Sequence, residues 1–379
     1  MPSWNRSLVA VPAAIAVVAV LGGGLLATMR GPQDQTGAAA APLSASVAAK
    51  TAPVAARTAP VAVKSATNGI IDATNLPTGR SPQLTYIRGR TVLGGVGSPV
   101  RVPGTNEIIA VARLWDTTMT VQVPTATSSF LMVQDYTGKV VNEIRSVDSL
   151  VTSADGKYVA FASGGRFSDH QSGGTLYFQE HTTGPADVLR QPKLTDVAVL
   201  AVVGHAVYFH GGTKPGDSWD LYRWDTEKMT VRELPKVTSP VSMTADGRLA
   251  AGMTVFTDSG QCSAVMDVAS QLQRWRTCEY RLDRFSPGNA YVVGLPPGTG
   301  EPYGEKRTAV LDGKTGKLLR QWTAPSLRAA VAEDDDHVLL QWHDQQEPQS
   351  RSAVVRCAIS TGQCELATPL SPEPLLLGS

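Results

Sequence analysis

Short apolar runs alternate with turn-forming residues along most of this chain. The clearest unit, Ser149–Arg190, contains four runs suited to strands, at residues 150–152, 158–162, 176–180 and 187–190. The first two runs are joined by Ser153-Ala154-Asp155-Gly156-Lys157. An Asp-Gly pair favours a tight hairpin because glycine readily adopts the positive φ that such turns need. The pattern predicts a unit of four strands.

A carboxylate recurs at the same place in successive units and gives the period. The positions are Asp135, Glu180, Asp225, Asp267 and Asp312, followed by Cys357, at spacings of 45, 45, 42, 45 and 45 residues. A repeat of this length, built from strands and turns, is typical of a β-propeller, in which each blade is a small sheet packed against its neighbours. The strand after each first turn is apolar with small residues, as expected for an inner strand covered on both faces. The sequence therefore predicts an all-β fold.

Strand-like fragments lie at both ends of the repeat region. Residues 85–89 and 99–102 give two strands of an incomplete unit, and residues 373–377 give an apolar strand at the other end. Together they can complete one blade. We therefore predict a seven-bladed β-propeller over residues 81–379, closed by pairing of N- and C-terminal strands, which leaves no long exposed edge. Six blades, with the N-terminal hairpin outside the ring, is the alternative.

The N-terminal part differs in character. Residues 8–28 are 21 residues without a charge, and about 20 apolar residues suffice to cross a bilayer. We predict a transmembrane anchor there, after a cytoplasmic stub at residues 1–7. A signal peptide cleaved near Ala38–Ala41 is the alternative. Residues 29–80, rich in Ala, Pro and Thr and without an aromatic residue, predict a disordered linker because they cannot offset the cost of ordering.

Charge argues against a nucleic-acid partner. The formal net charge is +1, from 34 basic and 33 acidic residues, so no strong field attracts a polyanion. Glycine (35) and proline (25) are plentiful, which suits short strands joined by tight turns. Long helices are not expected in the repeat region.

Four cysteines bracket two predicted hairpins. Cys262 and Cys278 flank the predicted strands at 263–267 and 273–277. If these strands pair so that the numbers of opposite residues sum to 540, the two sulfurs lie opposite each other. Cys357 and Cys364 flank a turn at the same position of another unit. Of the three possible connectivities, only Cys262–Cys278 and Cys357–Cys364 joins neighbours. Disulfides persist in oxidising compartments, so this pairing places the propeller outside the cytoplasm. Reduced core thiols are the alternative, and a four-cysteine metal site is disfavoured because the pairs lie on different blades.

Two segments carry a family resemblance. S-A-D-G-K-Y-V-A-F-A-S at 153–163 and L-Y-F-Q-E-H-T-T-G at 176–184 resemble the repeat of the TolB-type, WD-like propellers, a family of extracytoplasmic interaction domains. The resemblance covers about residues 84–378 and implies the fold. It does not select a function, because propellers with this repeat host scaffolding, binding and hydrolytic roles alike. Glu180 replaces the usual Asp, Gly204-His205 replaces an Asp-Gly turn, and the Gly-His and Trp-Asp signature is missing, so no functional residue is transferred.

Motifs for catalysis are missing from the sequence. The six histidines form no zinc-binding His-Glu-x-x-His pair, and no Gly-x-Ser-x-Gly word marks a nucleophile. His170 stands in a predicted loop, and His205 and His210 flank a predicted strand. We predict no catalytic, cofactor-binding or metal-binding residue and no cofactor.

Two other groups of residues invite a functional interpretation. The run Glu333-Asp334-Asp335-Asp336-His337 offers hard oxygen ligands for calcium, but it lacks the alternating spacing and central glycine of a calcium loop. A solvated acidic turn is the favoured interpretation. Trp224, Trp275 and Trp322 fall on predicted strands, which favours packing between blades over sugar binding.

The sequence thus predicts a membrane-tethered, extracytoplasmic propeller that acts as a non-enzymatic protein or glycan interaction module. Its partners would be a protein or cell-envelope component and, through the N-terminal helix, the membrane; nucleic acid is not expected. The predicted location is the cell membrane, single-pass, with the propeller outside. The alternative is a hydrolase or lyase that uses carboxylates or histidines at the central channel, since ligand sites of ring folds gather near the axis.

Overall fold

Strands dominate the computed structural model, which describes residues 67–164, 173–180, 186–214, 218–257, 260–298, 304–344 and 350–378. The predicted stub, the predicted anchor and most of the predicted linker lie outside these residues. Among the described residues the single helix is a 3-10 turn, Ala73–Asn75. None of the described segments forms a helix long and apolar enough to cross a membrane.

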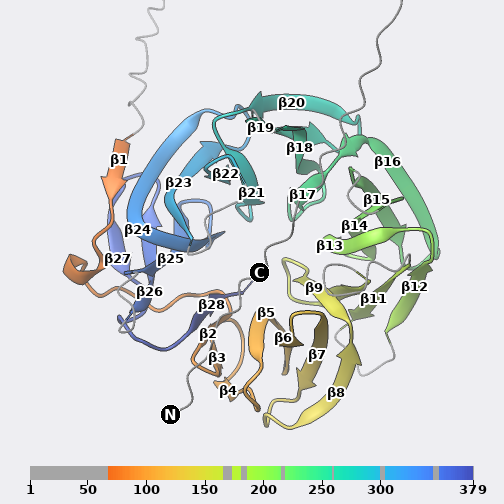
Figure 1. The fold of residues 1–379 in the computed structure, drawn as a ribbon, viewed down its shortest axis with the longest axis horizontal. Coiled ribbons are helices and arrows are strands. Elements are labelled where there is room, and N and C mark those ends of the chain that lie inside the picture. The colour runs from red at the N-terminus through yellow and green to blue at the C-terminus, as the bar shows by residue number, and fades with distance from the viewer. Residues whose placement is uncertain are drawn as a thin grey trace, which may run out of the picture. The chain divides into compact units, whose positions relative to one another are not determined.

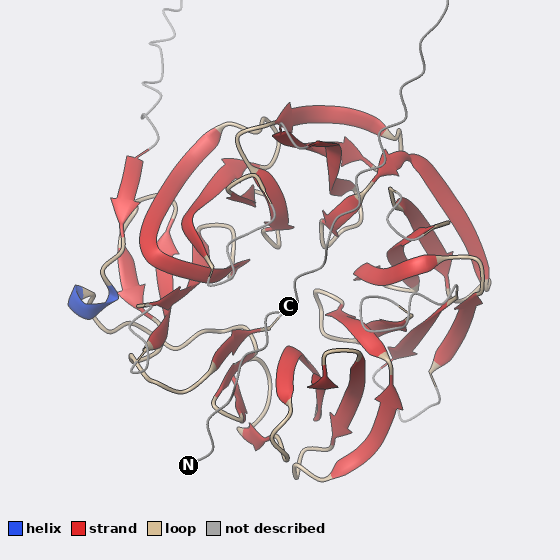
Figure 2. Ribbon diagram, viewed as in Figure 1, coloured by secondary structure: helices blue, strands red, loops and turns tan. Residues whose placement is uncertain are grey.

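Most strands belong to four-stranded sheets, and Figures 1 and 2 show the sheets arranged around a common centre. Four of these sheets are consecutive in the chain: β5 (Glu107–Leu114), β6 (Thr117–Thr125), β7 (Ser128–Gln134) and β8 (Val140–Arg145); β9 (Val147–Thr152), β10 (Tyr158–Ser163), β11 (Gly174–Glu180) and β12 (Asp187–Gln191); β13 (Thr195–Val203), β14 (Ala206–Gly212), β15 (Asp220–Asp225) and β16 (Thr230–Thr238); and β17 (Pro240–Met243), β18 (Leu249–Thr257), β19 (Gly260–Asp267) and β20 (Leu272–Thr277).

A larger, eight-stranded sheet follows. It runs through β21 (Arg281–Phe285), β22 (Tyr291–Leu295), β23 (Glu305–Asp312), β24 (Leu318–Ala332), β25 (His337–His343), β26 (Ser352–Ala358) and β27 (Cys364–Leu366). The first part of the 15-residue β24 pairs with β23 and the second part pairs with β25. β1 (Thr67–Ile70) lies parallel to the first part of β24, with Thr67 opposite Arg320.

Strands from both ends of the chain share one sheet. It contains β28 (Leu375–Leu377), β2 (Tyr86–Arg88), β3 (Thr91–Leu93) and β4 (Val100–Arg101), in that order. β28 is antiparallel to β2, with Tyr86 opposite Leu377. The three terminal segments predicted to complete one unit therefore do pair in a common sheet.

Hydrophobic clusters fill the space between neighbouring sheets. One cluster joins Leu176 and Phe178 of β11 to Phe209 of β14 and Trp224 of β15. Trp224 is fully buried and Trp322 is 1% exposed, which confirms that these residues pack between sheets. Trp275 is half-buried, and its indole nitrogen donates to the Gly313 carbonyl oxygen of the next sheet at 3.1 Å.

The turns show why the carboxylate recurs. Its side chain accepts a backbone hydrogen bond from two or three residues downstream: Asp135 from Thr137 at 2.9 Å, Asp225 from Lys228 at 3.1 Å, Asp267 from Ser270 at 2.9 Å and Asp312 from Thr315 at 2.7 Å. Such Asx-type bonds stabilise tight turns. The segment after Glu180 lies outside the described residues.

Both predicted disulfides are present. Cys262 is bonded to Cys278, and Cys357 to Cys364, each with a Cα–Cα distance of 4.1 Å. Ser263 pairs with Thr277, as the predicted register requires. The described residues contain no free cysteine, and at Cys357 a covalent bond fastens the hairpin where other units use a carboxylate.

Candidate functional site

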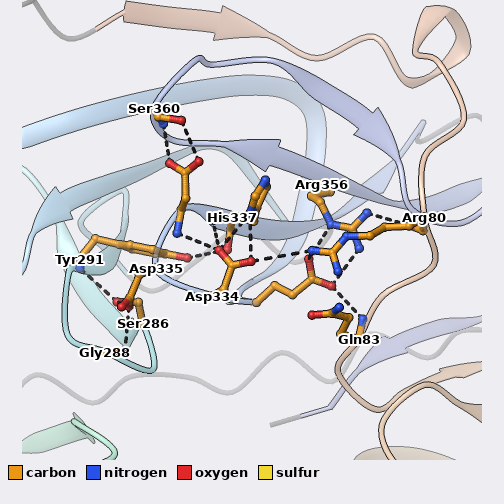
Figure 3. A network of polar contacts seen from close by, with 12 residues as sticks. Arg80, Gln83, Ser286, Gly288, Tyr291, Asp334, Asp335, His337, Arg356 and Ser360 are labelled. Atoms are coloured by element: carbon orange, nitrogen blue, oxygen red, sulfur yellow. Dashed lines mark hydrogen bonds and ion pairs between the residues drawn. The ribbon is translucent and has the colours of Figure 1, made fainter.

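The acidic turn, residues 333–336, connects β24 to β25 and is drawn in Figure 3. The side chain of Glu333 is fully buried against the guanidinium of Arg356 from β26, with Oε1 2.9 Å from Nη2. Glu333 also accepts from the backbone nitrogen of Gln83 at 2.8 Å and from Arg80 at 3.3 Å. Burial alone would raise the pKa of Glu333, but the hydrogen bonds from Arg356 and Gln83 outweigh it and hold the pKa below its ordinary value.

The side chains of the three aspartates of the acidic turn each accept hydrogen bonds from a different residue. Asp334 accepts from the backbone nitrogen of His337 at 2.7 Å and lies 2.9 Å from its Nδ1. Asp335 accepts from Ser286 Oγ at 2.7 Å, and Asp336 accepts from the backbone nitrogen of Ser360 at 2.8 Å. The turn therefore connects the segment before β2, the β21–β22 turn and the β26–β27 turn.

These contacts correct the favoured interpretation of residues 333–337. A solvated acidic turn is wrong for Glu333, because a deeply buried carboxylate is stable here only when paired with Arg356. Calcium binding gains no support, since no three metal-ligand side chains are grouped to hold an ion anywhere in the described part of the chain. The acidic turn is a structural junction.

The described histidines are also engaged in local structure. His210 is buried, its Nδ1 lies 2.9 Å from the Pro240 carbonyl oxygen, and its ring stacks on Trp219 at 4.3 Å. Burial lowers the pKa of His210. His205 is in the β13–β14 turn, 3.7 Å from Glu227. His170 and His181 lie outside the described residues.

A hollow of about 340 Å³ is lined by strands near the centre of the ring, β5, β21, β24 and β28. Its charged residues are three arginines and two carboxylates: Arg281, Arg284, Arg328, Asp283 and Glu305. The rest of its wall is mainly aliphatic and includes Ile109, Leu327, Leu376 and Leu377. We call this the arginine hollow.

One arginine of the arginine hollow forms an ion pair, and the other two do not. Glu305 is buried, and its carboxylate lies 3.6 Å from the guanidinium of Arg281. Within the described residues, neither Arg284 nor Arg328 has a hydrogen-bond or ion-pair partner. The hollow therefore contains more cationic than anionic groups.

A second surface feature lies at the turns of β3–β4, β5–β6 and β7–β8. Val96, Trp115 and Tyr136 are 76%, 51% and 71% exposed, and they line one hollow of about 480 Å³. We call these three residues the aromatic face. Trp115 adopts a φ of 53°, a left-handed conformation that is rare for a bulky side chain.

Arg113 holds the loop next to the aromatic face by hydrogen bonds. Its guanidinium donates to the carbonyl oxygens of Val92 at 3.1 Å, Val96 at 2.9 Å and Ser98 at 2.7 Å. Burial lowers the pKa of Arg113. The side chain therefore holds the β3–β4 loop, and with it Val96, beside Trp115.

The sequence interpretation missed both surface features. Arg281 and Arg284 occur on β21, and Arg328 occurs on the otherwise apolar second part of β24, where a charge was an available signal. Trp115 next to Asp116, between two largely apolar runs, was a weaker signal. The repeat does not predict either grouping, because it does not show which side chains of one sheet, or of different sheets, lie side by side.

Comparison with known proteins places the fold. No protein-family model matches the chain, and no curated protein is similar to it in sequence. Among solved structures, TolB from Acinetobacter baumannii is 14% identical over 69% of this chain and 63% of that chain, with a TM-score of 0.43. The match spans less than two thirds of the length of that protein. Prolyl oligopeptidase B from Galerina marginata is 10% identical over 77% of this chain and 51% of that chain, with a TM-score of 0.50.

The propeller domain of the Trilobed protease from Pyrococcus furiosus is a further match, 9% identical over 70% of this chain and 98% of that chain, with a TM-score of 0.41. The four-stranded sheets arranged around a common centre define a β-propeller fold. At these identities the comparisons establish the fold and not the activity.

Proposed function

We propose that this protein is a membrane-tethered, extracytoplasmic β-propeller that binds a protein or glycan partner without catalysing a reaction. The aromatic face is the observation that carries the proposal. Three large apolar side chains line one surface hollow, and exposed apolar groups that gather in this way are typical of interaction sites. Tyrosine and tryptophan supply much of the binding energy at such surfaces.

The hydrogen bonds of Arg113 support the same proposal. The bonds of Arg113 to the β3–β4 loop keep the surface ordered before a partner binds. A preformed surface lowers the entropic cost of binding.

We further propose that the ring has seven blades closed by the two ends of the chain. If the two parts of β24 count as separate strands, the sheets divide into seven four-stranded units. Each of the seven hydrophobic clusters joins adjacent units, and two of them join the β2-containing unit to its neighbours on either side. The pairing of β2 with β28 favours seven blades over six with an external hairpin.

The proposed location rests on the cysteines and the N-terminal sequence. Two disulfides favour an oxidising compartment, and residues 8–28 supply an apolar segment of membrane-spanning length. Residues 29–66 would separate the propeller from the membrane. The last part of the predicted linker, residues 67–80, is instead ordered on the propeller, because β1 pairs with β24 and Arg80 bonds to Glu333.

The hydrolase or lyase alternative has less support. Catalysis at the axis would require acids or histidines from several blades to converge there. The described wall of the arginine hollow contains Asp283 and Glu305 but no histidine, and Glu305 is occupied by Arg281. Aliphatic and guanidinium groups suit binding better than proton transfer, because arginine keeps its proton at ordinary pH.

Co-purification of the full-length protein from its native membrane tests the proposal. We expect a stoichiometric protein or glycan partner with the unmodified chain and at least a tenfold loss with Trp115→Ala/Tyr136→Ala. Met229→Ala/Leu272→Ala is the matched control, because both residues are exposed elsewhere, at 51% and 62%. Equal recovery with all three forms would remove the aromatic face from the proposal, and no partner with any form would refute an interaction role.

A further inference from the structure

We infer that the arginine hollow binds one carboxylate group with aliphatic groups next to it. The ligand we propose is a Glu or Asp side chain between leucines in a partner peptide. This inference rests on the proposed interaction function and specifies the chemistry that one part of the partner would need.

Arginines without an ion-pair partner in the described residues are the first argument. The Arg284 side chain is half-buried, and the Arg328 side chain is exposed. Both residues line the hollow, and neither has a partner in the described residues. Arg281 adds a buried Nε atom that donates no hydrogen bond. Guanidinium groups match a carboxylate geometrically because two parallel N–H groups can reach its two oxygens.

Charge balance favours a carboxylate over a phosphate. The three arginines carry three positive charges, and Asp283 and Glu305 carry two negative ones, so the lining has an excess of one positive charge. A carboxylate neutralises that excess. A phosphate with close to two negative charges would leave the hollow negative.

The aliphatic wall selects what the carboxylate is attached to. Ile109, Leu327 and Leu376 reach the hollow from three different strands. Apolar groups next to the anion would be buried against them, which adds free energy that a bare ion cannot gain. The size of the hollow, about 340 Å³, is enough for one or two side chains and too small for a folded domain.

Calorimetric titration of the full-length protein tests this inference with the peptide acetyl-Gly-Leu-Glu-Leu-Gly-amide. We expect saturable binding that weakens with added salt, because the interaction is charge-dependent. The same peptide with Gln in place of Glu should bind at least tenfold more weakly, since it loses the charge-assisted bonds.

Matched double variants separate the hollow from general charge effects. Arg284→Gln/Arg328→Gln should weaken peptide binding at least tenfold. Arg232→Gln/Arg276→Gln removes the same charge from exposed positions on outer strands β16 and β20 and should leave binding unchanged. Circular dichroism and thermal unfolding of each variant verify that it is folded. Equal loss with both pairs, or no saturable binding by the unmodified protein, overturns the inference.

Small anions distinguish the source of the carboxylate. If butyrate competes with the peptide in the unmodified protein, the hollow accepts a free aliphatic carboxylate as well, which supports the inference. If inorganic phosphate competes more strongly than butyrate, the assignment to a carboxylate is wrong. Co-purification of the native partner with Arg284→Gln/Arg328→Gln at unmodified yield would reject the hollow as a partner site and leave the interaction function intact.

Discussion

At the scale of single residues, Glu333 and Arg356 form an ion pair in which both charged groups are out of contact with water. The side chain of Glu333 is fully buried and that of Arg356 is 2% exposed. Arg356 also donates to the carbonyl oxygens of Arg80 and Ser81 at 2.7 and 3.0 Å, so it connects β26 to the segment before β2. A buried charge that loses its partner is left without solvation.

We therefore predict that Glu333→Ala lowers the free energy of unfolding by about 3 to 5 kcal/mol. The measurement is equilibrium denaturation in urea at neutral pH. Glu233→Ala is the control, because Glu233 is exposed on β16 and its replacement should change stability by less than about 0.5 kcal/mol. Similar stability of the two variants would mean that the pair is not important for the fold.

At the scale of elements, the turns between strands depend on ionised aspartates. Hydrogen bonds hold the pKa below its ordinary value at Asp135, chiefly from the Thr137 hydroxyl, at Asp225, from the Lys228 backbone, and at Asp267, from the Ser270 backbone and Arg274. A lowered pKa in the folded state means that the ionised form stabilises the fold. That contribution is present above the ordinary pKa of 3.8 and disappears as the pH falls through the lowered values.

The stability of the protein should thus decrease as the pH is lowered from 5 toward 2. Asp135→Asn/Asp225→Asn/Asp267→Asn should be less stable at pH 7 and should show a flatter dependence on pH in the acid range, as measured by urea unfolding at a series of pH values. Asp187→Asn serves as the control, because the side chain of Asp187 is exposed on β12 and forms no hydrogen bond with the described residues. An unchanged pH dependence in the triple variant would contradict this role of the turns.

The two disulfides fasten hairpins of different length. Cys262–Cys278 spans 16 residues and Cys357–Cys364 spans 7. The chain-entropy model gives roughly 3 and roughly 2 kcal/mol for these loops. We expect Cys262→Ala/Cys278→Ala to be the more destabilised double variant in thermal and chemical unfolding, and the reverse order would show that local strain or packing outweighs loop entropy.

At the scale of the whole molecule, the fold depends on contacts between residues at opposite ends of the sequence. Leu377 of β28 is 6% exposed and packs with Tyr86 of β2 and Leu339 of β25. Because β28 pairs with β2, its loss would expose a strand edge and the hydrophobic cluster beneath it.

Leu377→Ala should therefore cost about 2 to 5 kcal/mol, the usual range for truncating a buried leucine. Leu272→Ala, at a position that is 62% exposed, should cost far less. Guanidinium unfolding of both variants measures the difference. If Leu377→Ala were as stable as the control, the terminal strand would contribute little to the closure we propose.

Compartment is also a property of the whole molecule. If the propeller lies outside the cytoplasm, its cysteines should be oxidised. Protein isolated from its native membrane and denatured without reductant should then have no cysteine that an alkylating reagent modifies. Mass spectrometry of the alkylated chain gives the number of free thiols, and four labelled cysteines would contradict both the disulfides in the native protein and the proposed location.

The sequence predicted the repeating parts of the structure well. The Asp-Gly turn at residues 155–156 forms, with Gly156 at a φ of 68°, and the cysteines pair as the hairpins require. These features are local, so the spacing of a few residues is enough to specify them. Glu333 was misjudged because its neighbours in sequence are acidic and polar, whereas Arg356 and Gln83 reach it only through tertiary packing.

By itself, then, the sequence determined the all-β class, the period of the units, the turn chemistry and the cysteine pairing, because each depends on backbone preference and short-range spacing. The tertiary structure decided which distant residues share an environment. It buried Glu333 against Arg356, placed Val96, Trp115 and Tyr136 around one hollow, and grouped Arg281, Arg284 and Arg328 near the centre. Those groupings depend on how strands and sheets pack side by side, which the period of a repeat does not encode.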